Sequence, residues 1–177
     1  MGGSTQLIGV ALAIPHPWGP EIEGWRESFG DPQATSIPAH ITLLPPTRVS
    51  ESDLPRIRAH LAQAAADTDV FDVHLRGAGT FRPVSPVVFV SVSQGISGCE
   101  KLESRIRRGV LERELDYPYH PHVTVAHDVP EEVLDRAFES LSGFNARFAA
   151  SEFALYVHGD DGVWQVFERF PLRSADN

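Results

Sequence analysis

The stretches HITL at residues 40–43 and HVTV at residues 122–125 repeat one pattern: histidine, apolar residue, threonine, apolar residue. Successive side chains of a β-strand point to opposite faces, so the histidine and the threonine of each stretch share one face. The apolar residues then form the other face. We therefore predict two strands, each with a buried back and a polar, reactive front.

Hydrophobic patterning places each of these strands in a similar series of elements. We expect strands at 7–14, 71–76 and 87–93, helices at 20–29, 53–66, 102–110 and 131–142, and closing strands near 146–158 and 163–170. Residues 159–162, Gly-Asp-Asp-Gly, predict a hairpin turn between the closing strands. Each half of the chain thus runs strand, helix, His-x-Thr strand, helix and strand. This order predicts an α+β protein whose two lobes share one cleft.

The composition is that of an ordinary globular domain. The chain has 177 residues, a length that is sufficient to bury a core. Of these residues, 42% are hydrophobic and 22% are charged. We expect a single domain over residues 1–177, with lobes near 1–82 and 83–177 and an exchange of strands between them left open. The lone cysteine, Cys99, excludes a disulfide within these residues and a cysteine-based metal cluster. We also expect a monomer.

Charge and hydropathy limit the classes of partner. A net charge of −9 argues against an extended nucleic-acid surface, which needs many cationic residues. It is compatible with a small cationic pocket that binds one phosphate. No apolar run is long enough to span a membrane, and the first residues lack the basic and apolar regions of a signal peptide. We therefore expect a cytoplasmic protein that makes no membrane contact.

Two histidines and two threonines in matching contexts suit the cleavage of a phosphodiester without a metal ion. One neutral imidazole, of His40 or His122, would take a proton from the attacking water, and the other, protonated, would give a proton to the departing oxygen. Imidazole suits both roles because its unperturbed pKa is about 6.5. The hydroxyls of Thr42 and Thr124 lie on the same faces and can donate to phosphate oxygens. The pattern does not decide which histidine is the base.

These motifs resemble those of the 2H phosphoesterase superfamily, which includes 2′-5′ RNA ligase-like proteins and cyclic nucleotide phosphodiesterases. The resemblance rests on HITL, HVTV and the order of elements along nearly the whole chain. It implies two antiparallel sheets with flanking helices, related by a pseudo-two-fold axis, with the active-site cleft between the lobes. It implies catalysis by His40 and His122, phosphate binding by Thr42 and Thr124, and neither metal nor cofactor. The implied substrate is a small nucleotide or RNA end with a 2′,3′-cyclic or 2′-5′ phosphodiester.

The segments after the motifs differ from those frequent among RNA ligase-like members. Leu44-Pro45-Pro46 replaces a frequent Phe-Leu-Gly, and Ala126-His127 stands where a basic residue is frequent. The differences leave the implied fold and chemistry in place. They give no support to RNA as the substrate or to ligation.

Several further residues are candidates for the substrate side of the cleft. Aromatic faces can stack on a base, and the aromatic candidates are Trp18, Tyr119, Tyr156 and Trp164. His120 shares a strand face with the second motif histidine, and Arg82 lies at the junction between the halves, where a guanidinium could bind phosphate. Each of these residues also has a plain structural interpretation, as core packing or solvated surface.

Two other functions are compatible with the sequence. A metal-dependent hydrolase would use the region from His120 to His127, although His127 lies on the opposite strand face by parity. A member without turnover would bind a phosphorylated nucleotide as a sensor or partner module. Loss of activity with a chelator would identify the first, and absence of turnover would identify the second.

Overall fold

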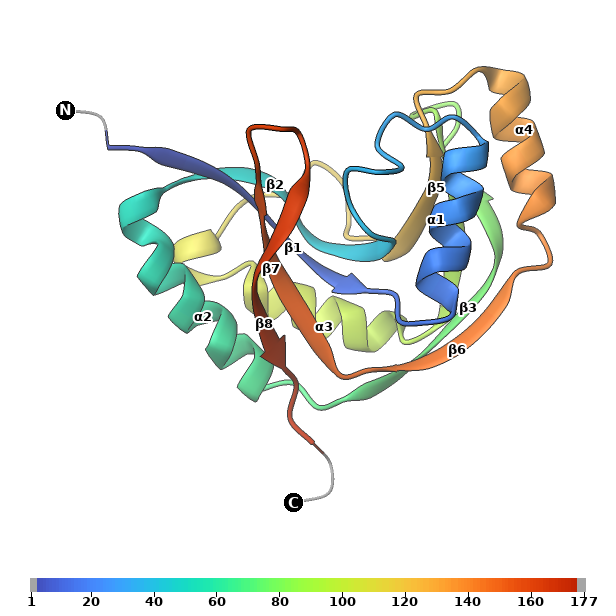
Figure 1. Cartoon of the computed structure of the whole chain (residues 1–177). Coiled ribbons are helices and arrows are strands. Elements are labelled where there is room, and N and C mark those ends of the chain that lie inside the picture. The colour runs from blue at the N-terminus through green and yellow to red at the C-terminus, as the bar shows by residue number, and fades with distance from the viewer. Residues whose placement is uncertain (1–2, 175–177) are drawn as a thin grey trace.

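The apolar stretches of the sequence form the inner strands of two antiparallel sheets. The computed structural model describes residues 3–174, which Figure 1 shows with helices packed around the sheets. The strands are β1 (Thr5–Ala13), β2 (His40–Ser50), β3 (Phe71–Thr80), β4 (Val87–Gln94), β5 (His122–His127), β6 (Asn145–Ala150), β7 (Glu152–His158) and β8 (Trp164–Pro171). The first sheet has the order β2-β1-β7-β8 and the second the order β5-β4-β3-β6. This α+β architecture confirms the predicted fold class.

The helices that flank the sheets are α1 (Trp18–Ser28), α2 (Leu54–Ala66), α3 (Ile96–Ile106) and α4 (Glu131–Ser140). α1 and α4 stand beside the second sheet in Figure 1, and α2 and α3 lie beside the first. α1 precedes β2 in the chain but packs on β5, and α3 precedes β5 but packs on β2. Each motif strand is therefore supported by the helix that precedes the other. None of the helices described in residues 3–174 has the length and apolar character to cross a membrane.

Two predicted elements differ from the structure. The helix expected at 102–110 begins earlier, at Ile96, and ends at Ile106. Gly109, with a φ of 58°, then opens a short 3₁₀ turn (Gly109–Leu111) instead of continuing the helix. The strand expected near 146–158 is two strands, β6 and β7, which belong to different sheets. The chain crosses between the sheets at Ser151, which lies between β6 and β7.

The two sheets combine strands from both halves of the sequence. β3 comes from the first half but lies in the second sheet, whereas β7 and β8 come from the second half and complete the first sheet. In each sheet the motif strand forms an edge, and the apolar strand at the start of the same half, β1 or β4, lies beside it. The motif strands therefore occupy equivalent places in the pseudo-two-fold arrangement.

Both motif strands contain a β-bulge directly after the threonine. In β2 the pairing with β1 skips Leu43 after Thr42. In β5 the pairing with β4 skips Val125 after Thr124. An extra residue of this kind shifts the alternation of the residues that follow it, as far as the next irregularity, which in β2 comes before Thr47.

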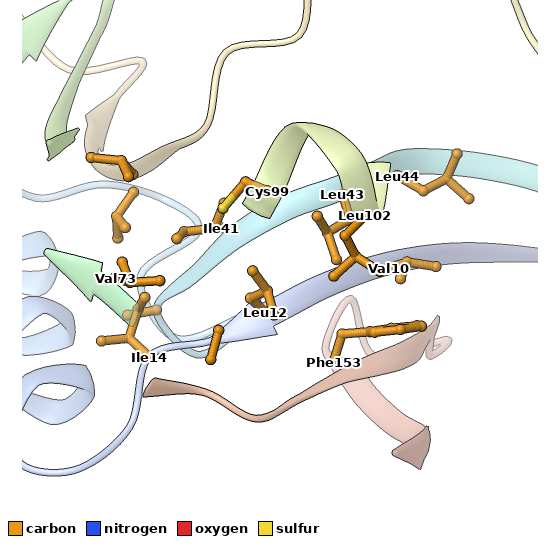
Figure 2. Packing of buried hydrophobic residues seen from close by; sticks show 14 of the residues in the cluster. Val10, Leu12, Ile14, Ile41, Leu43, Leu44, Val73, Cys99, Leu102 and Phe153 are labelled. Carbon is orange, nitrogen blue, oxygen red and sulfur yellow. The ribbon is translucent and has the colours of Figure 1, made fainter. Parts of the chain in front are cut away.

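The apolar backs of the motif strands form part of the core, as predicted. Ile41, Val123 and Val125 are fully buried, and Leu43 is nearly so. Figure 2 shows Ile41 close to Cys99 and Leu43 close to Leu102, both of them residues of α3. Burial of each such side chain stabilises the fold by about 1.5–3 kcal/mol. The polar fronts are thus held in place by packing on the opposite face.

Candidate active site

The edge strands β2 and β5 meet where the two sheets adjoin. Their Cα atoms approach to within 8 Å. Tyr119, just before β5, donates its hydroxyl hydrogen to the carbonyl oxygen of Thr42 in β2, with an oxygen–oxygen distance of 2.7 Å. Burial raises the pKa of Tyr119, so its hydroxyl remains a donor at every physiological pH. The two motif regions are therefore joined by a direct hydrogen bond.

The two motif histidines are held in the same way. Nδ1 of His40 lies 2.8 Å from the carbonyl oxygen of Pro38, and Nδ1 of His122 lies 2.7 Å from the carbonyl oxygen of His120. A carbonyl oxygen only accepts, so Nδ1 carries the hydrogen in both rings. Nε2 is then the acceptor of each neutral ring. Neither Nε2 atom has a hydrogen-bond partner within residues 3–174.

The surroundings lower the pKa of both histidines. Burial lowers the pKa of His40 from 6.5 to about 4, against the effect of its hydrogen bond with Pro38. The positive charges of Arg26 and His122 lower the pKa of His40 further, so the two motif histidines are close enough to interact. Burial also lowers the pKa of His122, by a smaller amount, and His120 adds to this effect. Both rings are therefore mostly neutral at pH 7.

A pocket of about 350 Å³, which we name the His40 pocket, opens beside His40. Its polar lining includes Arg26, Gln33, Thr42 and His127, and its apolar lining includes Leu44, Pro46, Tyr156 and Trp164. None of the described residues that line this pocket is acidic. In a chain with a net charge of −9, a pocket that contains the guanidinium of Arg26 and no acidic side chain favours an anionic ligand.

A second pocket of about 490 Å³, which we name the His122 pocket, opens beside His122. It is lined mainly by aromatic and apolar residues, among them Phe81, Val84, Leu115, Tyr117, Tyr119 and Pro118, together with His120. The ring of His122 lies edge-on to that of Phe81, with 4.9 Å between the ring centroids. Thr42 lines both pockets, so the two pockets meet at this residue.

The bulge in β5 brings His127 to the cleft. The predicted placement of His127 on the face opposite His122 is wrong, because the extra residue Val125 shifts the alternation. His127 lines the His40 pocket. The equivalent bulge in β2 places Pro45 in the His122 pocket. Each motif strand therefore sends the residue five places after its own histidine toward the histidine of the other strand.

The two motif threonines differ in position. Thr42 lines both pockets. Thr124 lies on the same face of β5 as His122 and is half-buried, but it lines neither pocket. The pseudo-two-fold relation thus holds closely for the histidines and less closely for the threonines.

The other sequence candidates divide between the cleft and its outside. His120 and Tyr119 line the His122 pocket. Arg82 lines neither pocket, and its Nη1 donates to a carboxylate of α4 at 2.7 Å. Trp18 also lines neither pocket and packs edge-on against a phenylalanine ring, with 6.3 Å between the centroids. Tyr156 and Trp164 line the His40 pocket, so the structure brings four of the six candidates to the site and leaves Arg82 and Trp18 outside it.

Arg26 is a pocket residue that the motifs do not identify. It lies in the last turn of α1 and lines the His40 pocket with only 8% of its side chain exposed. The sequence does hold a signal, because Ile22, Arg26 and Phe29 have the spacing of one apolar helix stripe. A charged residue within such a stripe needs a buried partner or a ligand.

The arrangement does not supply the ligands that a metal centre requires. His120 lines the His122 pocket and His127 lines the His40 pocket. Across residues 3–174, no three His, Cys, Asp or Glu side chains are grouped so that they could hold a metal ion. The metal-dependent alternative therefore has no ligand set in the described part of the chain.

The match to a protein-family model decides the family. Residues 14–162, which are most of the chain, match the model described as the 2′-5′ RNA ligase superfamily. The chain belongs to the 2′-5′ RNA ligase superfamily. The resemblance to 2H phosphoesterases, which the two motifs suggest, is thereby confirmed.

Relatives and solved structures agree with this membership. A Geobacillus sp. (strain WCH70) protein named “Putative phosphoesterase” is 29% identical over 136 residues, 76% of this chain and 78% of that protein. A Bacillus licheniformis protein of the same name is 29% identical over 147 residues, 80% of this chain and 85% of that protein. The crystal structure of E. coli LigT with NADP+ has a TM-score of 0.72 at 23% identity, and covers 96% of this chain and 99% of its own. LigT with 3′-AMP has a TM-score of 0.69 at 22% identity and the same coverage. These structures share the fold of this chain.

Proposed function

We propose that the protein is a metal-independent phosphodiesterase that cleaves a 2′,3′-cyclic or 2′-5′ phosphodiester in a small nucleotide or RNA end. The observation that carries the proposal is the matched pair of histidines. Each Nδ1 is bound to the carbonyl two residues earlier, which leaves each Nε2 as a free acceptor at one cleft. Family membership supports phosphoester chemistry. The crystal structures of LigT complexed with 3′-AMP and with NADP+ support a small nucleotide as the substrate.

In the proposed reaction the scissile phosphate lies between the two Nε2 atoms. His40 acts as the general base, because a pKa of about 4 keeps it neutral and able to accept a proton from water. The water oxygen forms a bond to phosphorus as its proton passes to Nε2 of His40. The bond from phosphorus to the ribose oxygen breaks, and that oxygen takes a proton from Nε2 of His122. The products are a phosphomonoester and a free ribose hydroxyl.

His122 acts as the general acid in this scheme. Its pKa is lowered less than that of His40, so it is the ring that protonates first. A bound phosphate raises the pKa of a neighbouring imidazole, because the negative charge favours the charged ring. The substrate itself therefore increases the fraction of His122 that carries the proton.

Thr42 is the threonine that we expect to contact the phosphate most directly. It lies where the His40 pocket and the His122 pocket meet, which is also the place that the scissile phosphate takes in the proposal. Its hydroxyl can donate to an oxygen that is not part of the cleaved bond. Thr124, on the same face of β5 as His122, contributes a second hydroxyl from the other strand.

Turnover with a chelator present tests the proposal. We expect the protein to hydrolyse adenosine 2′,3′-cyclic phosphate or a 2′-5′ adenylyl dinucleotide in the presence of EDTA. Chromatography of the products measures this hydrolysis. His40→Ala and His122→Ala should each lower kcat by about 10²–10⁴-fold. His16→Ala, at an exposed position between β1 and α1, is the matched control and should keep full activity.

Three results would overturn the proposal. Loss of activity in EDTA would indicate a metal-dependent hydrolase. Full activity of either histidine variant in the motifs would exclude the two-histidine mechanism. Tight binding of these nucleotides without turnover would indicate a catalytically idle binding module.

A further inference from the structure

Arg26 reaches the His40 pocket from a helix that otherwise packs into the core. Its neighbours on the same helix stripe, Ile22 and Phe29, are buried. Its own side chain is 8% exposed, and Arg26 lines the pocket beside His40. Its positive charge is close enough to act on His40. The guanidinium is therefore part of the pocket wall and not of the outer surface.

Asp31 fixes the orientation of this guanidinium. The Nε atom of Arg26 donates to Oδ2 of Asp31 at 2.8 Å. The side chain of Asp31 is fully buried, and its Oδ1 accepts the backbone N–H of Gln33 at 2.8 Å. Both carboxylate oxygens are thus engaged, and Asp31 itself does not line the pocket. One edge of the guanidinium is held, and its plane is set.

The other edge of the guanidinium has no protein partner. Neither Nη atom of Arg26 makes a hydrogen bond within residues 3–174. Every fully buried side-chain nitrogen or oxygen of the described residues does have a partner, so these two Nη atoms reach solvent-accessible space. A guanidinium edge with two parallel N–H groups matches two oxygens of one phosphate.

No described protein group in the pocket pairs with this edge of the guanidinium, so an anionic ligand can bind there. No acidic side chain of the described residues lines the His40 pocket, and His127 supplies a second imidazole in its wall, beside that of His40. The volume of about 350 Å³ falls in the range of about 300–1,000 Å³ that is typical of small-molecule sites. The space beside Arg26 is thus large enough for more than the scissile group.

Arg26 and the scissile phosphate of the proposed reaction take different places in the cleft. In the proposed reaction that phosphate lies between His40 and His122, where Thr42 joins the two pockets. Arg26 lines the His40 pocket alone. A phosphate bound to its free edge therefore lies within the His40 pocket and not between the two pockets.

We propose that the free edge of Arg26, fixed by Asp31, binds a second phosphate of the substrate, separate from the phosphodiester that is cleaved. The substrate class is a nucleoside cyclic phosphate or 2′-5′ nucleotide that carries a further phosphate, for example at its 5′ position. This inference rests on the proposed function and narrows it. The aromatic His122 pocket is then left for the base, since aromatic side chains stack on bases of any kind.

Two probes that differ by one phosphate test this subsite. The wild-type protein should cleave adenosine 5′-phosphate 2′,3′-cyclic phosphate with a kcat/KM about 10- to 100-fold higher than adenosine 2′,3′-cyclic phosphate, as a charge-assisted hydrogen-bond pair predicts. The double variant Arg26→Gln/Asp31→Asn replaces the buried ion pair by a neutral pair, which avoids leaving a carboxylate buried without a partner. It should lose this preference, so its kcat/KM should fall about 10- to 100-fold more on the probe with the 5′-phosphate than on the probe without it. Arg26→Lys should retain part of the preference, because it keeps the charge but not the fork.

The matched control is Arg58→Gln/Glu168→Gln, which removes an arginine–carboxylate pair of similar geometry from α2 and β8, outside both pockets. It should leave the preference unchanged. Equal kcat/KM values for the two probes with the wild-type protein would overturn the inference and leave the proposed function intact. An equal loss on both probes in the Arg26 variants would also overturn it.

Direct binding tests the subsite even if the protein turns over neither probe. Calorimetry with adenosine 3′,5′-bisphosphate and with 3′-AMP reports the contribution of the second phosphate without any reaction. The bisphosphate should bind the wild-type protein about 10- to 100-fold more tightly than 3′-AMP, and the Arg26→Gln/Asp31→Asn variant should bind both equally. A gain from the second phosphate that survives in the variant would contradict the assignment to Arg26.

Discussion

The His40 pocket and the His122 pocket lie on two sides of one cleft and are built on equivalent strands. In both, the Nδ1 of the motif histidine is bound to the carbonyl two residues earlier, and a bulge follows the motif threonine. Their walls differ. The first contains the guanidinium of Arg26 and no acidic residue, and the second contains the rings of Phe81, Tyr117 and Tyr119.

This difference separates two tasks within one site. The parts that repeat are the two imidazoles and the strands that carry them. The proposed chemistry needs both imidazoles, one on each side of the scissile phosphate. The parts that do not repeat determine how a substrate enters, because an anionic group and a base favour different walls. Burial is the main cause that lowers the pKa of both His40 and His122, and the charge of Arg26 lowers that of His40 further.

The largest effect should come from the element that the two pockets share. We expect each single alanine variant of His40 and His122 to lose about 10²–10⁴ in kcat, and the double variant to be little worse than the poorer single. Two groups that act on one transition state lose most of their effect when either is removed. Circular dichroism at increasing temperature would check that all three variants fold. If the loss of kcat in the double variant equalled the product of the two single losses, the two rings would act independently. That result would contradict their proposed action on one phosphate.

A smaller effect should distinguish the two threonines. Thr42→Val removes a hydroxyl at the place where the pockets meet, and we expect kcat to fall by about 10- to 100-fold, as for loss of a hydrogen bond to a charged group. Thr124→Val removes a hydroxyl that lines neither pocket, and we expect a loss below about tenfold. The two variants are matched in chemistry and in motif position. Equal losses would show that the symmetry extends to the threonines.

The smallest effect should come from the bond that links the two motif regions. Tyr119→Phe removes the hydroxyl that donates to the carbonyl of Thr42, and we expect the free energy of unfolding to fall by about 1–3 kcal/mol. Urea denaturation measures this change. Tyr117→Phe is the control, because this ring is 71% exposed and its hydroxyl has no partner among the described residues, so its effect should stay within about 0.5 kcal/mol. An unchanged free energy for Tyr119→Phe would show that the link adds no stability.

Much of the fold could be predicted from short-range patterns. The alternation in HITL and HVTV correctly predicts that Ile41 and Val123 are buried behind the two fronts. The helix stripes at 53–66 and 131–142 correspond to α2 and α4 within a few residues. Such elements are visible in one sequence because the period of the pattern and the period of the structure are the same.

The features that give the two pockets their different walls could not be predicted in the same way. The bulge at Val125, which brings His127 to the cleft, arises from pairing with β4 and not from the residues of β5 alone. The position of Arg26 on an apolar helix stripe indicates burial, but only the tertiary fold shows that its side chain lines the pocket beside His40. The switch of sheets at Ser151 has the same origin, since hydrophobic patterning reports burial and not which sheet provides it.

The pH dependence of kcat/KM tests the assignment of His40 as base and His122 as acid most directly. In the free protein the base must be neutral, so activity should fall as pH drops through about 4, the lowered pKa of His40. The acid must be protonated, so activity should also fall as pH rises through the pKa of His122, which burial places below 6.5. The two pKa values read from the profile belong to the coupled pair.

The measurement is the initial rate of hydrolysis of a 2′,3′-cyclic nucleotide, at low substrate concentration and in EDTA, from about pH 3.5 to 9. A cyclic phosphodiester keeps its single negative charge over this range, so the profile reports the protein. We expect a bell with its maximum on the acid side of neutrality, between about pH 4 and 6.5, and the loss of that bell in His122→Ala. A rate that climbs steadily into alkaline pH, or a maximum well above pH 7, would contradict the account.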